Sequence, residues 1–461
     1  MSSPTPVTGQ PRQLTLRLSL LGLLVNCKPS EPFLSVYLNE TKHLSEVELA
    51  TQVYPYSTLG TFAFQLPFAL LAECIGCRPV ILLGLMCREA TRAMLVFGEG
   101  VATMAVMQLL YSAGVCTDAL YFAYVYQAAP HDQYKRLTAI ILAAYHFGNV
   151  LAALLAEALV RLIPTLRADL TPLFYLSWAS TTLGLAAVAL LPPPLHTPPP
   201  SLAYHVLRSG GRRTFRELAA LYAPRASLLW LGWFLLAASG QAIVLNYFQL
   251  QILRSAGDEA FAPFGLLEAL LEAGLVLGAL FALSAAQPAA SRPAAFVTLT
   301  SIIRGAFLAL AALTAQGGGS SVVPATLNVA AAGVFGMQQA VASSHLAGTI
   351  SRAATTASRF PLLFGVNTLL ANGVAAALGA AGAAAGWSAN AYYWAASVML
   401  GALVVGVPVA MATTASSARL SVNATAEAVL VEEEEEPDAD DWIAPNSPPP
   451  RRPQASSGAV T

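Results

Sequence analysis

Twelve long apolar stretches, each close to the length of a membrane span, dominate this chain. A helix needs about 20 mostly apolar residues to cross the hydrocarbon core of a bilayer. Such stretches fall at 15–38, 54–74, 79–98, 101–127, 137–163, 171–192, 226–250, 263–287, 292–315, 324–349, 360–386 and 389–413. The pattern predicts an all-α membrane protein with twelve transmembrane helices.

The scarcity of charged residues agrees with this prediction. Only 11% of the 461 residues are Asp, Glu, Lys or Arg, and 56% are hydrophobic. An average soluble domain carries about 25% charged residues. A chain of this length with so little charge would expose large apolar surfaces to water. We therefore exclude a soluble multidomain enzyme, a disordered protein and a nucleic-acid-binding protein.

A polar break divides the twelve stretches into two groups of six. Residues 193–225 contain proline runs and a basic stretch, and we expect a central cytosolic loop there. Residues 414–461 hold nine acidic residues and three arginines, which predicts a disordered acidic cytosolic tail. The full prediction is a cytosolic arm, a six-helix bundle, the loop, a second six-helix bundle and the tail, at 1–14, 15–192, 193–225, 226–413 and 414–461.

Lysines and arginines in the loops orient the chain, because cytosolic loops of membrane proteins are enriched in both. With the N-terminus inside, the inner loops and the N-terminal arm hold twelve of these residues and the outer loops hold four. We therefore expect both termini in the cytosol. Asn39 begins the sequon Asn39-Glu40-Thr41 in the first outer loop, so we expect a glycan there.

Metal binding and catalysis find no support in the motifs. Cys74 and Cys77 form a C-x-x-C pair, but zinc usually needs four ligands and the sequence has no second pair. H-E-x-x-H and paired catalytic His and Asp motifs are absent. We expect no metal and no enzyme. A receptor or scaffold that acts through the tail remains an alternative to a transporter.

The first predicted span carries two charges and two prolines in the stretch Lys28-Pro29-Ser30-Glu31-Pro32-Phe33. Each proline removes a backbone donor and clashes with the preceding turn, so the span should be broken here. Broken helices at membrane depth face protein or a cavity, and transporters place binding sites there. A simple kink in which Lys28 pairs with Glu31 is the structural alternative.

Span four places an acid among aromatic side chains. Tyr111, Gly114, Asp118 and Tyr121 lie at helical spacing on one face. A carboxylate flanked by aromatic rings suits an organic cation, which the full charge and the ring quadrupoles both attract. The alternative is an aromatic packing stripe in which Asp118 bonds to a neighbour.

Ionisable residues in the remaining spans also need a reason, because a charge at mid-membrane costs about 2.5–3.5 kcal/mol on insertion scales. Span three carries Arg88, Glu89 and Arg92, which suit either internal pairing or an anion clamp. Span eight carries the like-charged pair Glu268 and Glu272, either a proton-coupling group or an inward-facing hydrogen bond. Arg304 is the charge of span nine, and we expect His146 and His345 to be packing residues.

Two bundles of six helices around a long inner loop are the plan of the major facilitator superfamily, whose halves rock around a site near the bilayer midplane. Within it, the sequence resembles the family of reduced folate carriers and thiamine transporters. The resemblance rests on motifs of helices 1, 4, 7, 8 and 11, found here at 28–33, 118–126, 134–136, 244–249, 267–269 and 359–368. The first of these is similar to the family's R-P-(S/G)-E-(P/S)-F.

The resemblance implies a carrier of a vitamin, folate or thiamine, with no cofactor. It implies a substrate site made by Glu31, Asp118, Tyr121, Asn246, Tyr247 and Glu268. We expect a secondary set of site residues in Lys28, Tyr56, Tyr111, Arg88, Arg92 and Asn367. Tyr56 is included because the family's helix-2 site aromatic falls on Ser57 here, and Tyr56 is the adjacent aromatic residue.

The acid of helix 4 favours thiamine over reduced folate. Thiamine carriers have a Glu at the position of Asp118, whereas the folate carrier has an Arg. Thiamine carries a fixed thiazolium charge, and folates carry carboxylates that need Arg or Lys. The family's helix-5 Arg falls on Leu142, which also argues against folate. We expect a monomeric carrier in the plasma membrane, facilitative or ion-coupled, with thiamine as substrate and reduced folate as the alternative.

Overall fold

A computed structural model of the chain describes residues 10–191, 225–256, 263–316, 322–352 and 360–406, with residues 216, 219, 220 and 222 between the first two ranges. Within these ranges the regular structure is helical, and no strand occurs. The predicted tail at 414–461, the first nine residues of the predicted arm and most of the predicted loop at 193–225 lie outside the described residues.

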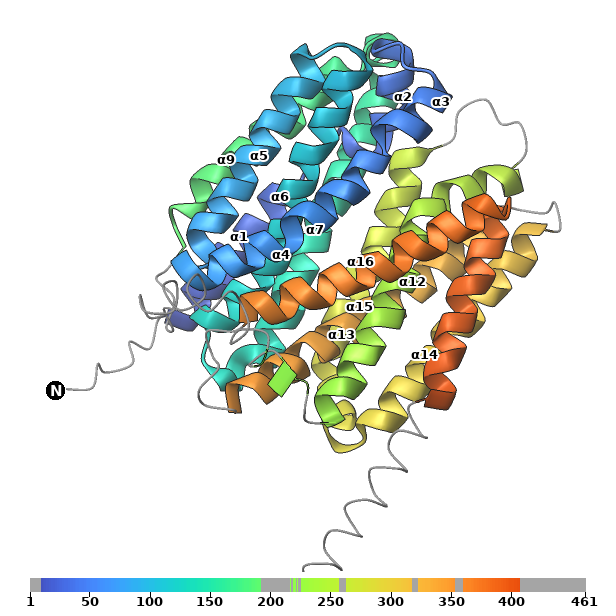
Figure 1. The fold of residues 1–461 in the computed structure, drawn as a ribbon. Coiled ribbons are helices and arrows are strands. Elements are labelled where there is room, and N and C mark those ends of the chain that lie inside the picture. Colours follow the sequence, from blue (N-terminus) through green and yellow to red (C-terminus); the bar gives the residue numbers. More distant parts are fainter. Residues whose placement is uncertain are drawn as a thin grey trace, which may run out of the picture. The chain divides into compact units, whose positions relative to one another are not determined.

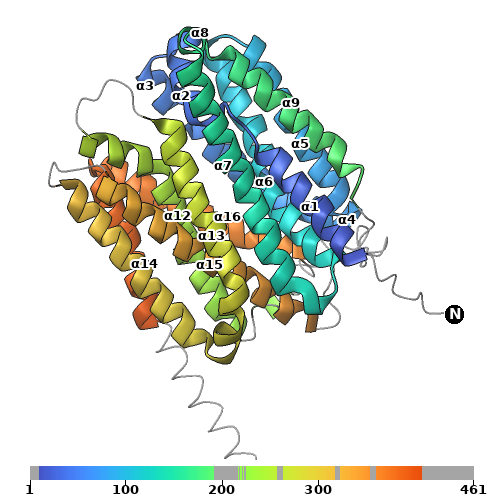
Figure 2. The ribbon, with the colours of Figure 1, turned by 180° about the vertical axis from the view of Figure 1, so that it is seen from behind.

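The first half of the chain builds one helical bundle, which is blue to green in Figures 1 and 2. Its long helices are α1 (Gln10–Asn26), α4 (Pro55–Ile75), α5 (Cys77–Phe97), α6 (Gly100–Ala128), α7 (Tyr134–Leu162) and α9 (Thr171–Val188). Short elements connect them: η1 (Glu31–Phe33), α2 (Leu34–Val36), η2 (Tyr37–Thr41), α3 (Glu46–Glu48), η3 (Leu49–Val53), η4 (His131–Gln133) and α8 (Thr165–Ala168).

The second half builds another bundle, which runs from yellow-green to red in Figure 1. Its long helices are α12 (Arg225–Ala256), α13 (Phe264–Ser291), α14 (Pro293–Gln316), α15 (Val322–Arg352), α16 (Phe360–Ala384) and a last helix, Ala389–Gly406. A separate apolar core, with Trp233 and Tyr393 among its buried rings, holds this bundle together.

Eight helices among the described residues are long and apolar enough to cross a membrane. They are α4 with the end of η3, α6, α7 with η4, α13, α14, α16, the central part of α12 and Ala389–Gly406. The other long helices, α1, α5, α9 and α15, also coincide with sequence-predicted spans. They are shorter or richer in polar residues, as α5 shows with its two internal arginines. The helical membrane fold is confirmed, while twelve crossings remain a prediction.

The break in the first span is confirmed. Helix α1 ends at Asn26, and the chain resumes regular structure only at Glu31 in η1. The freed backbone donors find new partners: the Ser30 N–H donates to Ser177 Oγ on α9 at 2.9 Å. The Glu31 N–H donates to the Lys28 carbonyl at 3.1 Å. The prolines therefore leave a satisfied, non-helical segment inside the protein, as membrane depth requires.

The two bundles contact each other through four pairs of long helices, α7 with α13, α7 with α15, α4 with α16 and α6 with α16, and through a smaller contact of η1 with α13. Small residues bring the backbones close. A Cβ at Gly365 of α16 would lie 2.5 Å from the Ala69 Cβ on α4. Within the second bundle, a Cβ at Gly278 of α13 would collide with the Gly333 carbonyl oxygen of α15. Such small residues are typical of tightly packed membrane helices.

Candidate binding cavity

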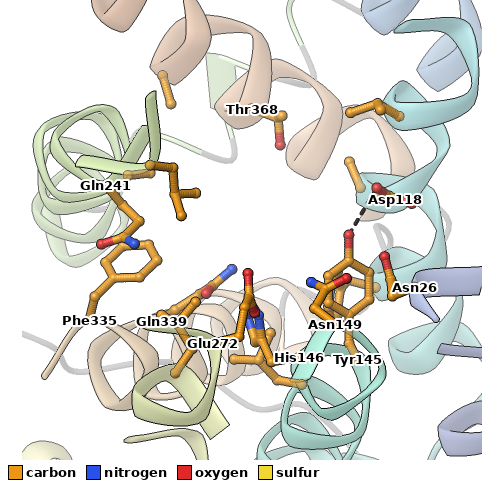
Figure 3. Close-up of a pocket in the computed structure, with 18 of the residues that line it drawn as sticks. Asn26, Asp118, Tyr145, His146, Asn149, Gln241, Glu272, Phe335, Gln339 and Thr368 are labelled. Atoms are coloured by element: carbon orange, nitrogen blue, oxygen red, sulfur yellow. Dashed lines mark hydrogen bonds and ion pairs between the residues drawn. The ribbon is translucent and has the colours of Figure 1, made fainter. Parts of the chain in front are cut away.

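A cavity of about 610 Å³ lies between the two bundles. Residues of the helix-1 break and of α4, α5, α6 and α7 line one side, and residues of α12, α13, α15 and α16 line the other. Figure 3 shows polar side chains from both halves around this space. The volume suits a small organic molecule, because ligand pockets usually measure about 300–1,000 Å³.

The helix-1 break places Lys28 and Glu31 at the cavity. Glu31 Oε1 lies 2.6 Å from an Arg92 Nη2 and 3.5 Å from Lys28 Nζ. Arg92 also donates to Ser30 Oγ at 3.2 Å, although it does not itself line the cavity. Lys28 Nζ stands 5.9 Å from the centroid of the Tyr111 ring. The acid of this motif is therefore shared by two cations.

Asp118 lines the cavity and is also paired. Its Oδ1 lies 2.6 Å from Arg88 Nη2, and its Oδ2 accepts a hydrogen bond from Tyr145 Oη at 3.0 Å. The Arg88 side chain is only 4% exposed, whereas that of Asp118 is 23% exposed toward the cavity. Arg88 also donates to the Gly114 carbonyl at 3.3 Å. The positive charge of α5 thus neutralises the acid of α6.

Helix α13 contributes two further acids, Glu268 and Glu272. Glu272 Oε2 lies 2.7 Å from His146 Nδ1, so this contact joins α13 of the second bundle to α7 of the first. Among the described residues, Glu268 has no hydrogen-bond or ion-pair partner. It lies close enough to Glu272, Glu31 and Lys28 for their charges to interact. Glu268 is therefore the lining carboxylate best placed to receive a cation.

Several other cavity residues were not predicted from the sequence as site residues. His146 was expected to be a packing residue, but it lines the cavity and bonds to Glu272. Gln241, Phe335 and Gln339 line the side of the second bundle, as Figure 3 shows. Amide side chains in the middle of apolar spans were the available signal, because a buried amide needs partners.

Six predicted site residues do not line this cavity. The Tyr121 hydroxyl donates to the Leu18 carbonyl at 2.6 Å and joins α6 to α1. Tyr247 stacks on Tyr392, with ring centroids 3.9 Å apart. Asn367 is buried and accepts from the Tyr222 hydroxyl at 2.5 Å. The remaining three are Arg92, which pairs with Glu31, and Tyr56 and Asn246, which are exposed on their helices.

Asn39 lies in the connection that follows the helix-1 break. Its side chain is exposed, and Nδ2 donates to the Leu44 carbonyl at 2.8 Å. Glycosylation of Asn39 stays a prediction.

The charges that line the cavity are unequal in number. Four acidic side chains, Glu31, Asp118, Glu268 and Glu272, face two basic side chains, Lys28 and Arg88. Arg92 adds one positive charge just behind Glu31. Counted against Lys28, Arg88 and Arg92 together, the acidic side chains are one in excess. In the part of the chain that the structure describes, no group of three metal-ligating side chains occurs.

A family model described as "Reduced folate carrier" matches residues 11–209 and 203–381. Thiamine transporter 2 of Homo sapiens is 34% identical over 148 residues, which are 31% of this chain and 30% of that protein. Folate transporter 1 of Caenorhabditis elegans is 32% identical over 150 residues, 32% of this chain and 33% of that protein. The chain thus spans about a third of the length of these relatives.

Solved structures show the same fold. The human organic anion transporter MFSD10 superposes with a TM-score of 0.59 at 15% identity, over 86% of this chain and 99% of that chain. The major facilitator superfamily transporter FucP, in its outward conformation, gives a TM-score of 0.60 at 13% identity, over 86% and 98%. At these identities the likeness concerns the fold alone.

Proposed function

Because the chain belongs to the reduced folate carrier family, in which curated relatives transport either thiamine or folate, we propose that this membrane transporter carries thiamine. It is an integral, multi-pass protein of the major facilitator fold, and its family implies a small vitamin as substrate. The finer assignment, thiamine in place of folate, rests on one observation, the surplus of carboxylates in the cavity.

The charge of the ligand decides between the two vitamins. A fixed organic cation inside a membrane protein needs a nearby carboxylate, because water no longer screens or solvates its charge. Glu268 offers a carboxylate that no described residue engages. The thiazolium ring of thiamine would bind there, and Glu31 and Asp118 would compensate the basic side chains beside them, so that these do not repel the ligand.

Reduced folate is the second candidate. Lys28 and Arg88 are the cations at the cavity that would hold its carboxylates. Both already bind acids of this chain, Lys28 with Glu31 and Arg88 with Asp118. A folate dianion would have to displace these acids and approach two more on α13. The electrostatics therefore favour the cation.

Transport would follow from the position of the site between the two bundles. Its walls belong to different halves, so rocking of one half against the other would open the cavity alternately to each side. We further propose that the carrier acts as a monomer in the plasma membrane and that both termini face the cytosol. Accessibility of tags at each terminus in intact cells would test the orientation.

Competitive uptake tests the substrate. Cells deficient in thiamine and folate uptake would express the chain and receive labelled thiamine, with unlabelled thiamine, reduced folate or pyridoxine as competitors. Saturable uptake that only unlabelled thiamine suppresses would support the proposal. Uptake that reduced folate suppresses at equal or lower concentration would instead make folate the substrate. Cells with the empty vector provide the control, and surface labelling normalises the expression.

A further inference from the structure

Arg304 of α14 is a buried cation that none of the substrate arguments uses. It is 0% exposed and lies behind the cavity wall. Its Nη1 donates to the Ala237 carbonyl of α12 at 3.0 Å, and its Nη2 donates to Gln241 Oε1 at 2.8 Å. No carboxylate among the described residues pairs with it. A charge buried at membrane depth is costly, so its retention calls for a functional reason.

The contact with Gln241 fixes which way that amide faces. A guanidinium only donates hydrogen bonds, so the amide must present its oxygen to Arg304. The amide nitrogen is then directed away from Arg304. Figure 3 shows the nitrogen on the cavity side of the oxygen, beside the Phe335 ring. Gln241 Nε2 is buried and has no hydrogen-bond partner among the described residues.

The same guanidinium also holds Phe335. The Arg304 Cζ lies 4.6 Å from the centroid of the Phe335 ring on α15, which is a cation–π contact. Phe335 and Gln241 both line the cavity. One buried cation thus immobilises an aromatic ring and an amide donor that adjoin each other on the wall of the second bundle.

We infer that Arg304 is a positioning residue that orients Gln241 Nε2 to donate to a ring nitrogen of a heteroaromatic substrate lying against Phe335. An unsatisfied buried donor calls for an acceptor, and a flat ring with an acceptor nitrogen meets both the amide and the phenyl face. The inference rests on the proposed function, for which the aminopyrimidine of thiamine supplies such a ring. It assigns that ring to the second bundle.

The test compares thiamine with an analogue in which the ring nitrogens of the pyrimidine are replaced by C–H groups. Binding of both compounds is measured on the purified, full-length carrier. The wild type should bind thiamine about tenfold more tightly than the analogue, the effect of one good hydrogen bond to a buried donor. In Gln241→Leu the ratio of the two affinities, thiamine over analogue, should fall to about one, because no donor remains for the ring nitrogen to engage.

Arg304→Met should lower the same ratio, since a released amide turns and no longer presents its nitrogen. Arg304→Lys keeps a donor toward the Gln241 oxygen and should recover part of the ratio. Because both residues act through one amide, the double variant Arg304→Met/Gln241→Leu should resemble Gln241→Leu alone. A purely structural role of Arg304 would lower the binding of both compounds equally and leave the ratio unchanged.

Gln338→Leu is the matched control. Gln338 is a buried glutamine on α15 that donates to Thr300 Oγ1 at 2.8 Å and does not line the cavity. Its replacement should keep the ratio near ten. A ratio that stays at ten in Gln241→Leu or Arg304→Met overturns the inference while thiamine binding by the wild type still stands. A wild type that binds no thiamine overturns the proposed function and the inference together.

Discussion

The pair between Arg88 and Asp118 yields a prediction in which stability and transport separate. Asp118→Asn removes the carboxylate and leaves Arg88, whose side chain is 4% exposed, with the Gly114 carbonyl at 3.3 Å as its remaining hydrogen-bond partner among the described residues. Removing one member of a buried ion pair usually costs about 3–5 kcal/mol, because the other charge stays buried without compensation. Asp118 is 23% exposed, so we expect the lower end, about 3 kcal/mol of unfolding free energy.

Transport should fall as well. Asp118→Asn deletes a negative charge and uncovers a positive one beside the cavity, so the surplus that attracts a cation falls. We expect thiamine uptake to decrease at least about tenfold at equal surface expression, which corresponds to about 1.4 kcal/mol. Uptake per surface molecule and the melting temperature of the purified protein are the two measurements.

The double variant Arg88→Met/Asp118→Asn separates the roles of the acid. It removes both charges together, so the number of surplus carboxylates in the lining is the same as in the wild type. Replacing a buried pair by apolar or neutral groups is often close to neutral for stability. We expect melting near the wild-type temperature and uptake within about threefold of the wild type. A well-folded double variant as inactive as Asp118→Asn would refute the reasoning and make Asp118 a direct contact of the substrate.

Three further predictions concern other parts of the molecule. Glu268→Gln should weaken thiamine binding about tenfold without lowering the melting temperature, because no described residue depends on that carboxylate; a loss of stability equal to that of Asp118→Asn would contradict this. Gly278→Leu should abolish surface expression, since its side chain would collide with the Gly333 carbonyl, whereas Gly401→Leu, where a Cβ meets nothing within 4 Å, should express normally. Asn39→Gln should remove a glycan and increase electrophoretic mobility; an unchanged glycosidase-sensitive band would place the glycan elsewhere.

The helical membrane fold was predictable because hydrophobic length is a local property of the sequence. The break at Pro29 and Pro32 was predictable for the same kind of reason, since proline acts on its own turn. These features need no knowledge of which helix lies beside which. The family motifs added the superfamily fold, which the family model and the solved structures support.

Partners across helices were not predictable in the same way. Glu89 stands between two arginines in sequence, which suggested that it neutralises one of them. In the structure it instead accepts hydrogen bonds from Trp178 and Thr182 of α9, at 2.7 and 2.9 Å. The arginines find their acids on η1 and α6. Such pairings depend on the rotation and depth of each helix, which a single sequence does not specify.

Residues carried over by resemblance show the same limit. Asn246 and Tyr247 lie within the stretch 244–249 that resembles the family's helix-7 motif, yet neither lines the cavity. The residue of α12 that does so in a polar role is Gln241, five positions before Asn246 and on another face of the helix. The motif therefore identified a helix that lines the cavity, but it did not identify which face of that helix points toward the cavity.

Direct binding to the purified carrier tests the central claim, that an acidic cavity selects an organic cation. Dissociation constants for thiamine and for reduced folate would be measured side by side on the same preparation, with and without Glu268→Gln. The account predicts that thiamine binds at least about tenfold more tightly than folate and that Glu268→Gln removes most of this preference. Tighter binding of folate, or a preference for thiamine that survives Glu268→Gln unchanged, would contradict it.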